Sequence, residues 1–327
     1  MNTKRRERKR MKITILDRCT VTNGDVSLRP LESVGQVQYY DVLPQQALVD
    51  AIGDSDAVIV NKARITAEVM DGCPNLRFIG LFATGYNNID TVAAAERGIV
   101  VCNVPGYSTE SVAQHTFALM LHFASRVDDY AASVARGDWA NAQAFSYLSF
   151  PMHELHGRTL GIFGYGNIGR AVARIALAFG MKVLATAHRA DAVAQEGVEL
   201  VDTDTLFSRA DYLSLHCPLT EQTRHLVNAR TLSLMKPGAI IINTARGGVI
   251  EEEALVEALN SGRLGGAGID VLDREPMRPG HPYLTAKNCY MTPHVAWGTL
   301  DARDRLIGMV VENLRAFEAG KPINKVN

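Results

Sequence analysis

The sequence predicts an α/β protein of two domains, each built on a parallel sheet. Short runs of β-branched residues alternate with helix-length segments from residue 12 onwards, as they do where crossover helices join parallel strands. One of these runs leads into a glycine-rich turn that opens a helix, which is a typical strand-turn-helix unit. The chain has 327 residues, enough for two domains with separate cores.

The expected strands fall into two series. The first series covers residues 12–16, 37–40, 57–61, 76–81 and 98–104, with helices that include 44–53 and 90–98. The second series covers residues 159–164, 182–187, 212–216, 239–245, 266–271 and 288–294. A last helix over 301–319 places apolar residues at helical spacing.

The Val-Pro-Gly sequence at residues 104–106 separates the two series and precedes an expected helix over 109–126. Ser108 can cap this helix, and Glu110 suits the positive end of its dipole. The helix is apolar around most of its circumference, which predicts burial between domains or in a subunit interface. Residues 128–150 are expected to be irregular.

The second series ends near residue 293, so we expect the chain to return to the first domain at that point. The predicted organisation is a discontinuous domain of residues 12–107 and 294–327 with an inserted domain of residues 108–293.

Composition and charge describe a soluble globular protein. The hydrophobic fraction is 47%, the charged fraction is 21% and the formal net charge is −1, which argues against nucleic acid as a partner. No apolar run approaches the length of a membrane span. The five cysteines show no metal-ligand spacing, so we expect no metal site and reduced thiols in a cytoplasmic protein.

Residues 1–11 form a basic extension that differs from the rest of the chain. Seven of the first twelve residues are Lys or Arg, and the apolar or amphipathic segment of a targeting signal does not follow them. We expect the extension to be disordered, or to precede a natural start at Met11, and assign it no function. A basic arm that binds nucleic acid is the less favoured alternative.

A glycine-rich turn follows the strand over 159–164 and runs Gly164-Tyr165-Gly166-Asn167-Ile168-Gly169. In a strand-turn-helix context this GxGxxG pattern predicts a dinucleotide site. Gly164 permits the tight turn, Gly166 lets the backbone approach a pyrophosphate, and Gly169 lets the helix pack on the strand. The helix N-terminus would stabilise the anionic charge. An ordinary glycine turn is the weaker alternative.

The end of the following strand should contact the adenosine ribose of the cofactor. NAD sites place an acidic residue about 20 residues after the turn, but this strand ends in Ala187-His188-Arg189, and the nearest acid is Asp191. The missing carboxylate removes repulsion of a 2′-phosphate, and Arg189 with His188 could pair with it. We therefore favour NADP over NAD; a solvated Arg189 on a surface loop is the alternative.

Arg246 follows the strand over 239–245, at the carboxyl end where open parallel sheets bind ligands. Its guanidinium can hold a carboxylate through two hydrogen bonds and polarise an adjacent carbonyl oxygen. With the carboxylate of Glu275 and the imidazole of His294, it supplies the residue types that reduction of a 2-oxo acid requires. An arginine paired with structural groups is the alternative.

The chain resembles the D-isomer-specific 2-hydroxyacid dehydrogenases over residues 12–325. The shared blocks, in the family's order, are GYGNIG, HCPLTEQT, MKPGAIIINTARGGVIEEEALVEAL, GAGIDVLDREP and TPHVAW. ATGYNNID and the tryptophan of HVAW resemble the glycerate dehydrogenase and hydroxypyruvate/glyoxylate reductase branch. The resemblance implies two doubly wound domains, a Rossmann cofactor domain and a flavodoxin-like substrate domain, with an active-site cleft between them.

The resemblance also implies a catalytic triad of Arg246, Glu275 and His294. In the family pattern Arg246 binds the substrate carboxylate, Glu275 hydrogen-bonds the histidine and favours its protonated form, and His294 is the general acid/base. Alone, Glu275 would be an ordinary surface residue and His294 one of nine histidines. The other histidines show no such partner pattern, and only His188 among them is given a ligand role.

Further contacts are carried over from the family in the same way. For the substrate, the resemblance points to backbone N–H groups at Thr84 and Gly85, with Asn61-Lys62 nearby, besides Arg246 and His294. Thr109 or Ser111 could meet the cofactor. The other cofactor contacts implied, besides those of the glycine turn, are Cys217, Pro218, Thr223, Thr244, Ala245 and Asp270; Asp270 could bind the nicotinamide carboxamide.

The expected function is reduction of a small 2-oxo acid, with hydroxypyruvate or glyoxylate favoured, to the D-2-hydroxy acid by an NAD(P)H-dependent homodimer. A relative specific for phosphoglycerate or lactate is one alternative. A dinucleotide-sensing corepressor, which shares the fold, is another. Formate dehydrogenases are disfavoured because they carry Gln where this chain has Glu275.

Overall fold

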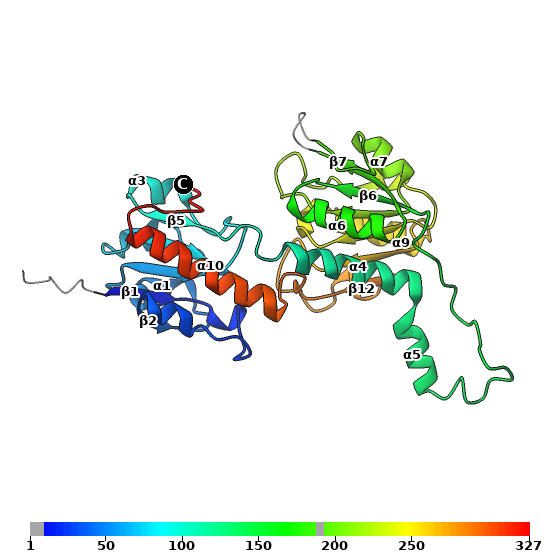
Figure 1. Cartoon of the computed structure of the whole chain (residues 1–327), viewed down its shortest axis with the longest axis horizontal. Helices are drawn as coiled ribbons and strands as arrows, with labels where there is room; N and C mark the ends of the chain where they lie inside the picture. Colours follow the sequence, from blue (N-terminus) through cyan, green and yellow to red (C-terminus); the bar gives the residue numbers. More distant parts are fainter. Residues whose placement is uncertain (1–9, 188–192) are drawn as a thin grey trace, which may run out of the picture. The chain divides into compact units, whose positions relative to one another are not determined.

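The computed structural model in Figure 1 describes residues 10–187 and 193–327. It divides into two compact units: the described residues up to Ser108 belong with Gly298–Asn327, and Thr109–Trp297 form the second unit. Each unit contains one sheet in which every pair of neighbouring strands is parallel. The predicted α/β fold with two parallel sheets is therefore confirmed.

The first unit has a five-stranded sheet in the order β2-β1-β3-β4-β5. β1 pairs with both β2 and β3, so the chain runs outward and then returns to the other side of β1. This flavodoxin-like order has its switch point between β1 and β3. The strands are β1 Met11–Ile15, β2 Gly35–Tyr39, β3 Ala57–Val60, β4 Phe78–Leu81 and β5 Val100–Cys102.

Short helices and one long helix pack on this sheet. The carboxylate of Asp90 accepts the Ala93 N–H at the start of α3, and the Thr299 hydroxyl accepts the Ala302 N–H at the start of α10. α10 packs on β4 and η2. The helices are α1 Leu48–Ile52, α2 Ala67–Asp71, α3 Thr91–Glu96 and α10 Leu300–Glu318, with 3-10 turns η1 Arg18–Thr20, η2 Arg29–Ser33 and η3 Gln45–Ala47.

The second unit has a seven-stranded sheet in the order β12-β11-β10-β9-β6-β7-β8. β6 pairs with both β7 and β9, so the winding direction reverses between β6 and β9. The short edge strand β8 was not predicted, because its three residues leave two exposed side chains and carry little strand signal. The strands are β6 Thr159–Phe163, β7 Lys182–Thr186, β8 Val198–Leu200, β9 Tyr212–Leu215, β10 Ile240–Asn243, β11 Gly266–Ile269 and β12 Cys289–Met291.

The apolar helix predicted over 109–126 is α4, Thr109–Ser125. It packs on α6, Asn167–Ala178, and on β10 and β11 of its own sheet. The helix is buried, as predicted, by packing within its own unit; a location between domains or in a subunit interface stays a prediction. The other helical elements of this unit are α5 Val127–Ala135, α7 Thr203–Arg209, α8 Ala229–Leu234, α9 Glu252–Asn260, η4 Gly247–Val249 and η5 Pro282–Leu284.

The prediction of an irregular segment over 128–150 is wrong for its first part. α5 covers Val127–Ala135, with Asp128 and Asp129 in its first turn, where acidic side chains stabilise a helix. Residues 136–158 lack regular structure. In Figure 1, α5 and this segment extend away from the sheet of their own unit.

The second unit extends four residues beyond the predicted boundary at 293. Residues 294–297 belong to it because the carboxylate of Asp270, after β11, accepts the N–H groups of Val295 and Ala296.

Among the described residues, no helix is long and apolar enough to cross a membrane.

Candidate active site

Three predicted site residues follow three neighbouring strands of the seven-stranded sheet. Arg246 comes after β10, Glu275 after β11 and His294 after β12. These strands are adjacent and parallel, so their following loops leave the sheet at one edge. The loop after β9 and the glycine turn after β6 continue the same edge. Residues far apart in the sequence therefore share the edge where parallel sheets bind ligands.

His294 and Glu275 form a hydrogen-bonded pair. The imidazole Nδ1 lies 2.7 Å from Glu275 Oε2, and the two side chains are 25% and 33% exposed, so the pair is accessible to a ligand. Glu275 Oε1 also accepts the backbone N–H of Leu272 at 3.1 Å. Because a carboxylate can only accept, Nδ1 carries the shared proton and Nε2 is the nitrogen left for chemistry.

The loop that carries His294 is held by Asp270, which is only 2% exposed. The Asp270 carboxylate accepts the Thr292 hydroxyl at 2.5 Å and the N–H groups of Val295 and Ala296 at 2.9 Å each. The Asp270 carbonyl accepts the His294 N–H at 2.8 Å. His294 itself has φ +56, a conformation that non-glycine residues seldom adopt. The network around Asp270 therefore fixes an otherwise unfavourable backbone at the imidazole.

The loop that carries Arg246 is fixed by a buried asparagine and a close backbone contact. Asn243 accepts the Ala245 N–H and donates to the Arg246 carbonyl, each at 3.0 Å. A Cβ on Gly247 would lie 1.8 Å from the carbonyl carbon of Leu272. Only glycine allows this approach, which places the Arg246 loop against the loop leading to Glu275. The Arg246 side chain is exposed, and its Nη1 donates to the Ala245 carbonyl at 2.7 Å.

The glycine turn after β6 has the geometry of a phosphate cradle. Gly164 has φ +101, and a Cβ there would lie 2.7 Å from the carbonyl of His216 after β9. A Cβ on Gly169 would lie 2.3 Å from the Gly164 oxygen. Among the described residues, a Cβ at Gly166 would meet nothing within 4 Å, and no side chain caps the start of α6. Open space over uncapped helix N–H groups fits a pyrophosphate at this switch point.

The side chains of the other predicted cofactor residues are mostly engaged within the protein. Cys217 is buried, and burial raises the pKa of its thiol to about 11. The Thr223 hydroxyl donates to the Pro218 carbonyl at 2.6 Å. Thr244 Oγ1 lies 3.3 Å from Thr116 Oγ1. Asn167 is exposed, Ile168 half-buried and Ala245 buried. His188, Arg189 and Asp191 lie outside the described residues.

Thr84 and Gly85, the residues predicted for the substrate carboxylate, follow β4 at the carboxyl edge of the five-stranded sheet. The Thr84 hydroxyl donates to the Val104 carbonyl at 2.8 Å, and Asn103 donates to the Thr84 carbonyl at 2.7 Å. These two hydrogen bonds fix the backbone of the loop at Thr84. Asn88 links it to the loop after β3 by donating to the Ala63 carbonyl at 2.8 Å.

The loop after β3 is in turn organised by Asp17, a buried residue after β1. Its carboxylate accepts the Asn61 N–H at 2.9 Å and the N–H groups of Lys62 and Ala63 at 2.6 Å each. Burial raises the pKa of Asp17, against the lowering effect of these bonds. The switch point of the first sheet is thus filled by the protein's own carboxylate, which fixes the loop at Asn61-Lys62.

The comparisons with known proteins agree with this arrangement. The sequence profile described as "D-isomer specific 2-hydroxyacid dehydrogenase, NAD binding domain" matches residues 117–296. The chain belongs to the D-isomer specific 2-hydroxyacid dehydrogenase family. It is an NAD(P)-dependent dehydrogenase, and the resemblance seen in its motifs is confirmed.

Curated relatives and solved structures cover nearly the whole dehydrogenase chain. It is 42% identical to a hydroxypyruvate reductase of Blautia hydrogenotrophica, over 97% of this chain and 100% of that one. It is 38% identical to a glycerate dehydrogenase of Methylorubrum extorquens, over 96% and 98%. The TT0316 protein from Thermus thermophilus superposes with a TM-score of 0.86 at 38% identity, over 97% and 100%. An acyclic imino acid reductase in complex with NADPH and D-Arg gives 0.85 at 30% identity, over 97% and 100%.

Among the described residues of the dehydrogenase, three further histidines lie near carboxylates, which the sequence did not reveal. His115 Nε2 is 3.7 Å from Asp270 Oδ1, His122 Nδ1 is 3.0 Å from Asp128, and His281 Nε2 is 3.1 Å from Glu252. The partners of His115 and His281 are distant in the sequence, so local spacing gives no signal for them.

Among the described residues, no group of three or more His, Cys, Asp or Glu side chains could hold a metal ion.

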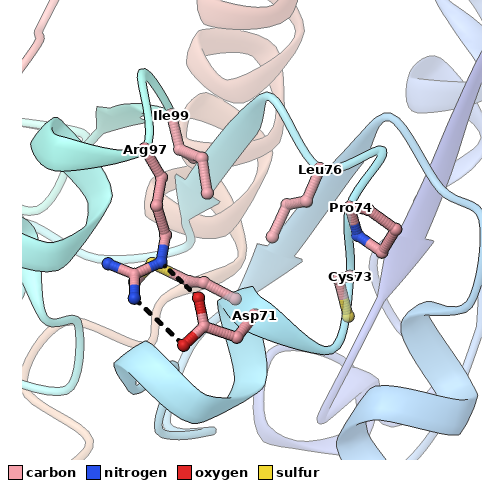
Figure 2. A pocket seen from close by; sticks show the side chains of 7 residues that line it. Asp71, Cys73, Pro74, Leu76, Arg97 and Ile99 are labelled. Atoms are coloured by element: carbon pink, nitrogen blue, oxygen red, sulfur yellow. Dashed lines mark hydrogen bonds and ion pairs between the residues drawn. The ribbon is translucent and has the colours of Figure 1, made fainter.

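A small surface pocket of about 210 Å³ lies elsewhere, in the first unit (Figure 2). Leu76 and Ile99 in its wall precede β4 and β5, so it lies at the amino-terminal edge of that sheet. Its one guanidinium, from Arg97, is bound to both oxygens of Asp71 at 2.7 and 3.0 Å. This pocket is therefore not the dehydrogenase site.

Proposed function

We propose that this dehydrogenase reduces hydroxypyruvate or glyoxylate with NAD(P)H to the 2-hydroxy acid, of D configuration where the product is chiral. The proposal rests chiefly on the 2.7 Å pair between His294 Nδ1 and Glu275 Oε2. This pair shares a sheet edge with Arg246 and the glycine turn. An oriented imidazole, a guanidinium and a phosphate cradle together suit hydride transfer to a 2-oxo acid.

Arg246 is proposed to bind the substrate carboxylate and to polarise the adjacent carbonyl. Its side chain is exposed, while its backbone is fixed by Asn243 and by the contact at Gly247. A planar guanidinium can donate two parallel hydrogen bonds to a carboxylate. It also stabilises the negative charge that develops on the carbonyl oxygen during reduction.

His294 is proposed to donate the proton to the forming alkoxide through Nε2. Its Nδ1–H is directed at Glu275, so the carboxylate orients the ring with Nε2 left for the transfer. In the oxidative direction the neutral imidazole takes the proton back. Glu275 therefore acts through His294 and is itself held by the Leu272 N–H.

The cofactor is proposed to lie with its pyrophosphate over Gly166, because the open space there and the uncapped start of α6 fit an anionic group. When bound, NAD(P)H supplies the hydride for C2 of the substrate. We favour NADPH on the sequence Ala187-His188-Arg189, which contains no acidic residue that would repel a 2′-phosphate. The NADPH complex of a structural relative at 30% identity supports this preference.

The substrate assignment is supported by relatives named hydroxypyruvate reductase and glycerate dehydrogenase, at 42% and 38% identity. We further propose that the first unit, the described residues up to Ser108 with Gly298–Asn327, is the substrate domain and that the second unit, Thr109–Trp297, is the cofactor domain. In this assignment, backbone N–H groups at Thr84 and Gly85 bind the substrate carboxylate; the hydrogen bonds that fix this loop support it.

The protein is proposed to form a homodimer through α5 and the segment after it. Large apolar side chains are exposed along this stretch: Trp139 is 53% exposed, Phe145 91%, Leu148 82% and Met152 50%. Apolar side chains gathered in this way on a projecting segment are typical of a protein interface.

One matrix of initial rates tests the proposed function. Glyoxylate, hydroxypyruvate, pyruvate and phosphohydroxypyruvate are each assayed with NADH and with NADPH. The highest kcat/KM is expected for hydroxypyruvate or glyoxylate with NADPH. A preference for NADH would refute the interpretation of Arg189, and a preference for phosphohydroxypyruvate or pyruvate would favour the other specificities. Tight NADH binding without turnover of any substrate would favour a dinucleotide sensor.

A further inference from the structure

Polar side chains on α4 contact both loops of the proposed catalytic site. The Ser111 hydroxyl donates to the Ala296 carbonyl at 2.6 Å, and His115 Nε2 lies 2.9 Å from Thr292 Oγ1. These two residues are one helical turn apart and therefore share a face of the helix. Thr116 Oγ1 lies 3.3 Å from Thr244, two residues before Arg246. α4 thus contacts the histidine loop, defined as residues 292–296, at both of its ends.

The direction of each hydrogen bond around Thr292 follows from the chemistry of its partners. The Asp270 carboxylate can only accept, so the Thr292 hydroxyl donates to it at 2.5 Å. The hydroxyl has no second proton, so it accepts from His115, and Nε2 of His115 carries a proton in either charge state. His115, Thr292 and Asp270 therefore form a directed chain of hydrogen bonds from α4 to the histidine loop.

The chain ends on the backbone that sets the position of His294. Asp270 accepts the N–H groups of Val295 and Ala296 through its carboxylate and that of His294 through its carbonyl. The φ of +56 at His294 has to be held by such surroundings, because it is unfavourable for a residue with a side chain. Loss of the His115 N–H would leave the Thr292 oxygen without its donor, so that Thr292 and Asp270 would be held less firmly.

We propose that His115 is a positioning residue for the reaction, acting through Thr292 and Asp270 on the placement of His294. The inference rests on the proposed role of His294 as general acid/base. The His115 side chain is only 22% exposed and touches the loop rather than the reacting atoms. Its effect is on geometry: a shift of about 1 Å in a catalytic group can lower turnover on the order of a hundredfold.

The test compares two substitutions at His115 with a matched control. His115→Leu removes the donor, whereas His115→Gln can place an amide N–H near the position of Nε2. His122→Leu makes the same change two turns further along α4, at a histidine whose ring contacts Tyr290 at a tilt and whose Nδ1 hydrogen-bonds Asp128. His115→Leu is expected to lower kcat roughly tenfold, and His115→Gln to restore it to within about threefold of wild type. The control should keep wild-type kcat.

Two readouts separate positioning from loss of folded protein. Rates are expressed per NADPH-binding site, counted by titration, so unfolded protein does not contribute. The primary isotope effect with nicotinamide deuterated at C4 should rise in His115→Leu, because the chemical step becomes slower. Thr292→Val breaks the same chain, so its effect on kcat should not add to that of His115→Leu.

Hydrogen exchange provides a measurement that does not depend on activity. Amides of the histidine loop, residues 292–296, should exchange faster in His115→Leu and Thr292→Val, and at the wild-type rate in His115→Gln and His122→Leu. Unchanged exchange and unchanged kcat in His115→Leu would overturn the proposal, as would equal losses in the Leu and Gln variants. A wild-type enzyme without turnover would contradict the proposed function instead, while faster loop exchange in His115→Leu would still support the structural chain.

Discussion

Single residues at the sheet edge have properties that their surroundings dictate, and His216 after β9 is a clear case. Its Nε2 bonds the Ser214 hydroxyl at 2.8 Å, whereas its Nδ1 is buried without a hydrogen-bond partner among the described residues. Although part of the residue reaches the surface, the ring nitrogens are enclosed. Burial lowers the pKa of His216 to about 3, so the ring stays neutral beside the glycine turn.

The stability of the protein should therefore depend on pH through His216. An unfolded histidine takes up a proton below its ordinary pKa of 6.5, and the folded one does so only near 3, so stability is lost as the pH falls between these values. This group should cost about 1 kcal/mol between roughly pH 6.5 and 5.5. Denaturant unfolding of wild type and His216→Gln measures it: the variant should lack this part of the decline. Parallel pH dependences would contradict the assignment.

Candidate site residues could be singled out from the sequence only where a local motif marks them, and their roles stay predictions. Arg246, Glu275 and His294 stand in blocks whose order is specific to the family. No local motif marks His115 or Asp17. Their hydrogen-bond partners lie 177 and 44 to 46 positions away in the sequence. Contacts of this kind arise from strand order, which places distant loops together, and a single sequence contains no trace of them.

Among the structural elements, the glycine turn and α6 allow the cofactor cradle to be tested without disturbing the fold. A Cβ at Gly166 would touch no atom of the described residues within 4 Å, and the residue does not have positive φ. Gly166→Ala should therefore leave the melting temperature within a degree or two. It should weaken NADPH binding on the order of tenfold or more, because the methyl group occupies the space where the pyrophosphate approaches the backbone.

Gly308→Ala is the matched control for this substitution. Gly308 lies inside α10, and a Cβ there would also meet nothing within 4 Å. The change should stabilise the helix by about 0.5–1 kcal/mol and leave NADPH binding unaltered. Unchanged cofactor affinity in Gly166→Ala, measured by fluorescence titration, would contradict the proposed position of the pyrophosphate.

The elements that the sequence predicted well are those with a strong local pattern. β3, β4 and β10 are buried at every position, and all their residues except Asn243 are apolar; the glycine turn sets the start of α6. β8 and α5 were missed. β8 is short and exposed, and its strand conformation depends on pairing with β7. Helix α5, which begins at Val127, was missed because the apolar side chains around it obscured its helical pattern.

For the whole molecule, the central prediction is dimer formation through α5 and the segment after it. Replacing Phe145 and Leu148, which are 91% and 82% exposed, by Asp should leave the fold intact. It should convert the dimer to monomers at micromolar concentration, because charged side chains in an apolar interface are not compensated. Sedimentation velocity measures the change, with Val92→Asp, 69% exposed in the first unit, as the control. A wild-type monomer would contradict the proposal.

The overall fold was predictable because alternation of strands and helices dictates parallel sheets, and the position of the GxGxxG turn marks the second unit. The exact boundary was not, since residues 294–297 are held in the second unit by Asp270. Cofactor preference depends on residues around Arg189, which the structure does not describe. The substrate likewise depends on loops such as that of Thr84. The conformation of this loop is set by hydrogen bonds to Val104 and Asn103 more than by a local sequence pattern.

The account depends most on His294 as the general acid/base of a 2-oxo acid reductase. The most direct measurement is the initial rate of hydroxypyruvate reduction by NADPH in wild type, His294→Ala and His156→Ala, with His156 an exposed histidine ahead of β6. We expect kcat to fall by about 10³ in His294→Ala, with NADPH affinity within about twofold of wild type and His156→Ala unchanged. Near wild-type turnover in His294→Ala would contradict the account.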